Sequence, residues 1–340
     1  MNKKKYFISN INHFKNKTKS YKHKQYGGNL DISGPVKIGY FVSDKFNKKI
    51  IVISDIHGEY KGSCDDQSSL SITNYIESII TDYPIDIFIE TDIPNHQFLS
   101  NPSDKYLKLI IPKIPNKKDF IGDLVDFSYK NYKLNPNKRF HFIDIRYDIN
   151  GQDIYRNIEK VITMIKSGII KIKDDNLSEV IHELITDYVF AFINIIQWIS
   201  EPNFDDIQRI IPYYFYKEFE LLSKSNPKEI DSMVEILKSN IKNFLDIYFE
   251  TNENYNIDQV DEMYMLGIVA GASVTDFYTV ARIMKSDQYN KCIIYGGLAH
   301  YSIIKLYLES VGFECINEIS STESEFRCVK DVQDFNSFFD

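Results

Sequence analysis

Short apolar runs that each end in an ionisable residue constrain the fold of this chain more than any other feature. Residues 48–55 (KKIIVISD), 84–91 (PIDIFIET) and 139–146 (RFHFIDIR) have the composition of strands, and residues 69–83 have apolar side chains at helical spacing. This order predicts a β-α-β unit whose strands are parallel and buried on both faces. Because α/β proteins bind ligands at the carboxyl ends of such strands, the ionisable residues there are candidates for function.

A long helical block separates two stretches of α/β pattern. Helical periodicity dominates residues 151–258, and the strand pattern returns at 291–300 and 313–319. We therefore expect an α/β fold with a mainly parallel sheet, flanked by helices and interrupted by a large all-helical insertion or lid. Residues 1–34 are expected to be a basic, disordered arm, and residues 35–150 the first part of the α/β core. Residues 151–258 would form the insertion, and residues 259–340 the second part of the core. Residues 326–332 are expected to add a final edge strand.

The charge is distributed unevenly along the chain. Residues 1–28 carry eight lysines and no acid, whereas the remainder has 32 basic against 48 acidic residues, a net charge of −16. A lysine-rich arm can bind the phosphates of nucleic acid, but the acidic body would repel a polyanion, so we expect a solvated arm. The most apolar stretch, residues 188–199, is shorter than the roughly twenty residues of a bilayer span. It predicts a buried helix and no membrane partner.

Composition and cysteine spacing indicate the class of protein and its cellular location. With 340 residues, 43% of them hydrophobic and 26% charged, the chain has the composition of a globular protein. The abundance of Asn, Lys and Ile resembles the usage of large cytoplasmic DNA viruses or of AT-rich protists, and a viral source would place the protein in the host cytoplasm or the virion. The four cysteines show no C-x-x-C pairing. We therefore expect free thiols, a cytoplasmic location and no disulfide framework.

The stretch IIVISDIHGEY (residues 50–60) opens like a calcineurin-like metallophosphoesterase, in which an Asp-x-His motif begins a two-metal site. GDLVD (122–126) imitates the second motif of that class, but it follows polar sequence and not an apolar strand. The chain has no Gly-Asn-His turn and no His-x-His pair. A divergent metallophosphoesterase is therefore kept only as an alternative.

Residues at the ends of different predicted strands form a stronger candidate site. Asp55 and His57 follow the first run, Glu90 ends the second, Arg146 ends the third, and His300 ends the run KCIIYGGLAH. His57 and His300 would act as general bases or, with Glu90, as a His-His-Glu set for one divalent transition metal. Arg146 would hold negative charge on a substrate, and Asp55 would orient a neighbouring group.

Three stretches resemble the erythromycin esterase/ChaN/TraB–Tiki superfamily: IIVISDIHGEY, PIDIFIETD and IIYGGLAHYSIIKLYLESVGF. Glu90 and His300 are similar to the acid of the family's second strand and to its later Gly-x-x-His motif, and Arg146 is similar in position to a family arginine. Ser54 stands where the first motif of the family has Gly.

The resemblance implies a hydrolase of ester or peptide bonds that acts on a small-molecule or peptide substrate, with or without a metal. Because haem binding also occurs in the family, a non-catalytic ligand-binding protein is an alternative. A viral structural or interaction protein with the same fold is another. An enzyme is the favoured interpretation.

Overall fold

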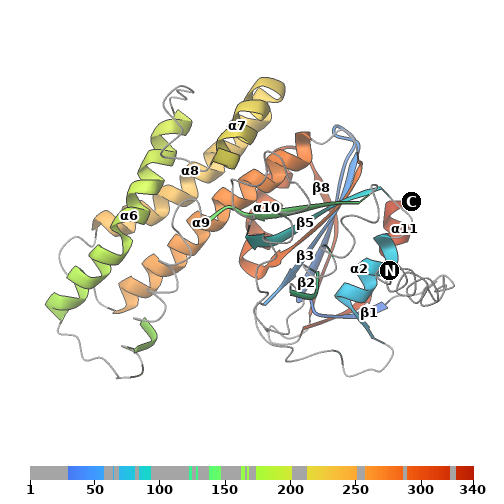
Figure 1. Cartoon of the computed structure of the whole chain (residues 1–340), viewed down its shortest axis with the longest axis horizontal. Helices are drawn as coiled ribbons and strands as arrows, with labels where there is room; N and C mark the ends of the chain where they lie inside the picture. The colour runs from blue at the N-terminus through green and yellow to red at the C-terminus, as the bar shows by residue number, and fades with distance from the viewer. Residues whose placement is uncertain are drawn as a thin grey trace, which may run out of the picture.

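The computed structural model describes residues 30–56, 64, 69–80, 84–92, 122–124, 128, 138–146, 162–164, 167, 174–200, 213–250, 257–285, 289–321 and 327–340. Within these ranges the chain forms a six-stranded sheet, a small three-stranded sheet and a set of helices (Figure 1). His57 and the lysines of the basic arm lie outside the described residues.

The large sheet has the strand order β6-β5-β7-β3-β2-β8. Its members, in chain order, are β2 (Lys37–Ser43), β3 (Lys48–Asp55), β5 (Ile85–Asp92), β6 (Lys138–Asp144), β7 (Lys291–Gly297) and β8 (Glu314–Ser320). The pairs β6–β5, β5–β7 and β7–β3 are parallel, whereas β2 pairs antiparallel with both β3 and β8. The α/β class is thus confirmed, but the sheet is mixed and not mainly parallel. A four-residue turn joins β2 to β3, and so short a connection can only join antiparallel neighbours.

The small sheet pairs β1 (Leu30–Ser33) with β4 (Leu70–Ser71) in parallel and with β9 (Cys328–Val332) in antiparallel orientation. Two expectations need correction here. The range predicted for the disordered arm, residues 1–34, includes β1, so the folded part of the chain already includes Leu30. The final strand, β9, does not extend the large sheet but pairs with β1.

Helices cover both faces of the large sheet (Figure 1). One face packs against α2 (Ile72–Ile80) and α11 (Phe335–Phe339), and the other against α9 (Ile257–Lys285) and α10 (Leu298–Ser310). The strands supply the two cores alternately: in β3, Ile51 and Ile53 face α2 and α11, while Ile50 and Val52 face α9 and α10.

The remaining long helices lie beyond α9, on the side away from the sheet (Figure 1). They are α6 (Asp174–Ser200), α7 (Tyr213–Ser225) and α8 (Pro227–Glu250), all within the range expected for the helical insertion. The apolar stretch 188–199 forms the second half of α6 and is largely buried, as predicted. Among the helices that the structure describes, α9 alone has the length and composition of a membrane span, and 72% of its most apolar window is buried within the fold.

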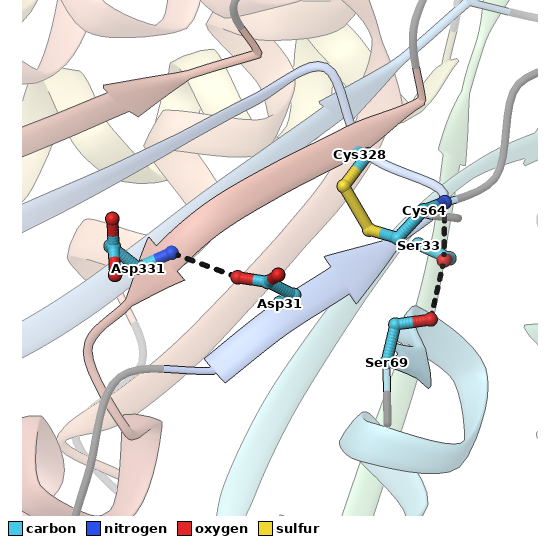
Figure 2. The surroundings of a disulfide bond; sticks show 6 residues. All are labelled: Asp31, Ser33, Cys64, Ser69, Cys328 and Asp331. Carbon is cyan, nitrogen blue, oxygen red and sulfur yellow. Dashed lines mark hydrogen bonds between the residues drawn. A yellow bond between two sulfur atoms is a disulfide. The ribbon is translucent and has the colours of Figure 1, made fainter. Parts of the chain in front are cut away.

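A disulfide joins Cys64 to Cys328, which corrects the expectation of free thiols (Figure 2). The two Cα atoms are 5.0 Å apart although 264 residues separate the cysteines in sequence. Nearby, the Cys64 amide donates to Ser33 Oγ at 3.0 Å, and Ser33 and Ser69 share a hydroxyl hydrogen bond of 3.3 Å. The pair therefore connects the chain after β3 to the first residue of β9.

Candidate functional site

The carboxylate of Glu90 is the centre of a buried polar network at the carboxyl end of β5. Its Oε1 lies 2.8 Å from Arg146 Nη2 and 2.9 Å from His300 Nε2, and its Oε2 accepts from the Gly297 amide at 2.5 Å. A Cβ on Gly296 would come within 3.1 Å of Oε2. The glycine pair at the end of β7 thus leaves room for this carboxylate to reach the backbone.

Arg146 follows β6 and is held in place by Asp144. Its Nε and Nη2 donate to the two Asp144 oxygens at 2.9 and 2.8 Å, and its backbone amide donates to Oδ1 at 3.1 Å. The guanidinium bridges Asp144 and Glu90 and is the most exposed part of the described network, with 17% of the side chain accessible against 4% for each carboxylate. The network therefore meets solvent through Arg146.

His300 connects this network to α9. It lies in the first turn of α10, three residues beyond β7 and not at the strand end itself. Its Nδ1 is 2.7 Å from Oδ1 of Asp276, a fully buried residue of α9. Sequence reasoning did not include Asp276 in the site. The available signal was a carboxylate within the apolar stretch of α9, because such a group is rarely buried without a partner.

The two carboxylates set the charge of His300. Burial lowers the pKa of the imidazole, but the neighbouring Asp276 and Glu90 outweigh burial and raise the pKa to about 10. For Asp276, burial raises the pKa, and the attraction of His300 offsets this only in part, leaving it at about 6. At neutral pH His300 is therefore an imidazolium that donates from both nitrogens, so the expected role of general base needs correction.

The described residues also do not fit the expected divalent metal. They include no group of three His, Cys, Asp or Glu side chains arranged to hold one. Glu90 lies against the guanidinium of Arg146, and His300 has no lone pair while both its nitrogens carry protons. We therefore derive no chemistry through a metal.

Within the part of the chain that the structure describes, Asp55 lies apart from the Glu90 network. It is buried at the end of β3 and accepts a hydrogen bond from Tyr295 Oη at 2.7 Å. Both residues belong to the face that carries Ile51 and Ile53, whereas Glu90 is on the opposite face, in line with Phe88. The structure thus brings together Glu90, Arg146 and His300 from the predicted set and separates Asp55 from them.

A second polar cluster lies at the opposite end of the same strands. The Asp86 carboxylate accepts from Arg139 Nε and Nη2, each at 2.6 Å, and lies 3.0 Å from His141 Nε2. Arg282 of α9 donates to His141 Nδ1 at 3.0 Å. Burial alone would raise the pKa of Asp86, but its bonds to His141 and Arg139 lower it to about 2. This cluster offers an arginine–aspartate pair, with Arg139 on β6 and Asp86 on β5, at the end of these strands opposite to the candidate site.

The segment that imitated a second metallophosphoesterase motif is helical where it is described. Gly122, Asp123 and Leu124 form a helical turn, and Asp123 is exposed. Asp123 therefore lies in a helical turn, and the alternative of a metallophosphoesterase stays a prediction from the sequence pattern.

Comparison of the chain with protein-family models, with curated proteins and with solved structures finds no match. The resemblance to the erythromycin esterase/ChaN/TraB–Tiki superfamily stays a prediction from the sequence motifs.

Proposed function

We propose that this protein is a hydrolase of ester or peptide bonds whose site lies at the carboxyl ends of β5, β6 and β7. The observation that carries the proposal is the convergence of four separate segments on one buried network. β5 supplies Glu90, the end of β6 supplies Asp144 and Arg146, α9 supplies Asp276, and α10 supplies His300.

In this proposal Arg146 is the residue that meets the substrate. Two bonds to Asp144 fix the plane of the guanidinium, so its position requires little reorganisation during the reaction. A fixed cation beside a carbonyl oxygen stabilises the negative charge that develops when the carbonyl is attacked. The imidazolium of His300 places a second positive charge against the same Glu90 oxygen that Arg146 contacts. The general base would come from His57, a role that rests on the sequence pattern alone.

A conservative change of Arg146 tests the proposal. Arg146→Lys keeps the charge but loses the planar two-point contact, and we expect it to lower kcat/KM by about a hundredfold, the size of effect seen when one oxyanion donor is lost. The measurement is turnover of p-nitrophenyl esters and fluorogenic peptides by the full chain.

The matched control is Arg139→Lys, because Arg139 makes the same kind of double contact with an aspartate at the opposite end of β6. We expect this variant to keep its activity at a similar melting temperature. Equal loss of activity in both variants would mean that the network serves stability and not the reaction.

One observation favours a non-catalytic alternative. Both oxygens of Glu90 and both nitrogens of His300 already have partners within the network. A site with its polar atoms satisfied in this way suits a protein that binds a small molecule without turning it over. A wild-type chain that hydrolyses no member of the substrate panel would support this alternative.

A further inference from the structure

Two neighbouring strands of the large sheet, β3 and β7, are each followed at the carboxyl end by an exposed apolar residue next to a buried one. At the end of β3, Asp55 is buried while the next residue, Ile56, is 38% exposed. At the end of β7, Gly297 and the later His300 are buried while Leu298 between them is 41% exposed. Polar groups thus lie inside and apolar side chains outside, which is the informative exception to the normal pattern.

The parallel register of β3 and β7 places the exposed Ile56 and Leu298 just beyond the ends of two neighbouring strands. Asp55 pairs with Gly297 at the ends of the two strands, so Ile56 and Leu298 leave adjacent strands at the same edge of the sheet. Leu298 directly follows Gly297, whose amide contacts Glu90, and Glu90 in turn contacts Arg146. The carboxylate of Glu90 therefore lies between the backbone next to Leu298 and the guanidinium of Arg146, which we propose contacts the substrate.

A single exposed apolar side chain is ordinary on a protein surface. The other large apolar side chains that are exposed in the described chain lie elsewhere: Phe190, Phe249 and Met265 on α6, α8 and α9, Leu306 further along α10, and Ile316 on β8. Among these described side chains, only Ile56 and Leu298 follow directly on paired ends of neighbouring strands, and Leu298 also follows the glycine that contacts Glu90. A substrate group that covered them would remove apolar surface from water at the position where the polar network holds the reacting group.

We propose that Ile56 and Leu298 form an apolar subsite that binds the acyl chain or side chain next to the bond being cleaved. The substrate class is then an ester or peptide whose acyl part is apolar. This inference rests on the proposed function, because Arg146 supplies the polar end of the same site. The product of either reaction is a carboxylate with an apolar chain, which matches a cation beside an apolar surface.

Binding of straight-chain carboxylates from acetate to octanoate tests the subsite without requiring turnover. Each methylene that leaves water on the subsite should tighten binding to the full chain by about two- to fourfold. Calorimetry or NMR titration gives the affinities. We expect Leu298→Ser to flatten this dependence on chain length while leaving acetate binding unchanged.

The matched control is Leu306→Ser, which removes an exposed leucine of the same helix that is 51% accessible. This variant should keep the dependence on chain length. Wild-type affinities that do not change with chain length, absence of binding by every carboxylate, or equal flattening in both variants would each overturn the subsite. Chain-length-dependent binding without hydrolysis of any ester would keep the subsite and reject the hydrolase, so the two proposals fail separately.

Discussion

His300 owes its charge to two carboxylates that burial brings within hydrogen-bonding distance. Its pKa is about 10 in the folded chain, against about 6.5 for an unperturbed histidine. The folded state therefore binds more protons than the unfolded state between these two values. The stabilisation is complete below about pH 6.5 and is lost as the pH rises toward 10.

The first prediction concerns this pH dependence. Replacing the partner by Asp276→Asn removes the negative charge that raises the pKa of His300, so the pKa should fall. The free energy of unfolding of the variant should then decline less steeply than that of the wild type between about pH 7 and pH 10. Urea denaturation across this range measures the slope, and NMR titration of the His300 ring measures the pKa directly.

His300→Gln serves as the control, since a side chain that does not titrate removes the contribution of His300 to the slope. An NMR titration that shows neutral His300 in the wild-type chain at pH 7 would contradict the assignment of an imidazolium at neutral pH. An unchanged ring pKa in Asp276→Asn would show that Glu90 alone maintains the charge.

At the scale of elements, the sequence predicts strands and helices well but not the face on which a residue lies. The ends of β3, β5 and β6 were predicted from apolar runs, and three predicted site residues do converge. The prediction for Asp55 is wrong because the end of a strand specifies only the edge of the sheet at which a residue lies. The alternation of side chains along β3 specifies the face, and it places Asp55 on the face opposite to Glu90. Asp276 was missed because its partner lies 24 residues further along the chain, on another helix.

The position of α10 against the sheet depends on a glycine in β2. A Cβ on Gly39 would overlap the hydroxyl of Tyr301 and lie 2.9 Å from its Cζ. The Tyr301 hydroxyl donates to Glu318 Oε2 of β8 at 2.8 Å. Because the Tyr301 ring is buried, it cannot move into solvent without shifting α10.

We therefore predict that Gly39→Ala destabilises the fold by about 1–3 kcal/mol, the usual cost of adding a methyl group to a filled core. Denaturant unfolding measures this cost. The double variant Gly39→Ala/Tyr301→Phe removes the overlapping oxygen, so it should lose less stability than the sum of the two single variants. Strictly additive losses would show that the methyl group and the hydroxyl do not meet.

At the scale of the whole molecule, the Cys64–Cys328 disulfide links two described residues that are 264 positions apart in sequence. Arg327, the residue before it, donates to the backbone carbonyl of Ile56. Arg327 thus holds the chain at Ile56, directly before His57, and Cys328 holds it at Cys64, after His57. Sequence alone could not predict the pair, because four cysteines allow several pairings and a separation of 264 residues leaves no local spacing to read.

The final prediction is that Cys328→Ser lowers the free energy of unfolding by about 2–4 kcal/mol, because opening a long loop returns conformational freedom to the unfolded chain. Thermal and urea unfolding under oxidising conditions measure the loss, and a reductant should produce the same loss in the wild type. Cys315→Ser is the matched control, since Cys315 is a free, partly exposed thiol on β8. This variant should behave like the wild type with and without reductant. Thiol titration that finds four reactive cysteines in the denatured, unreduced chain would rule out the disulfide, and the expectation of free thiols would then stand.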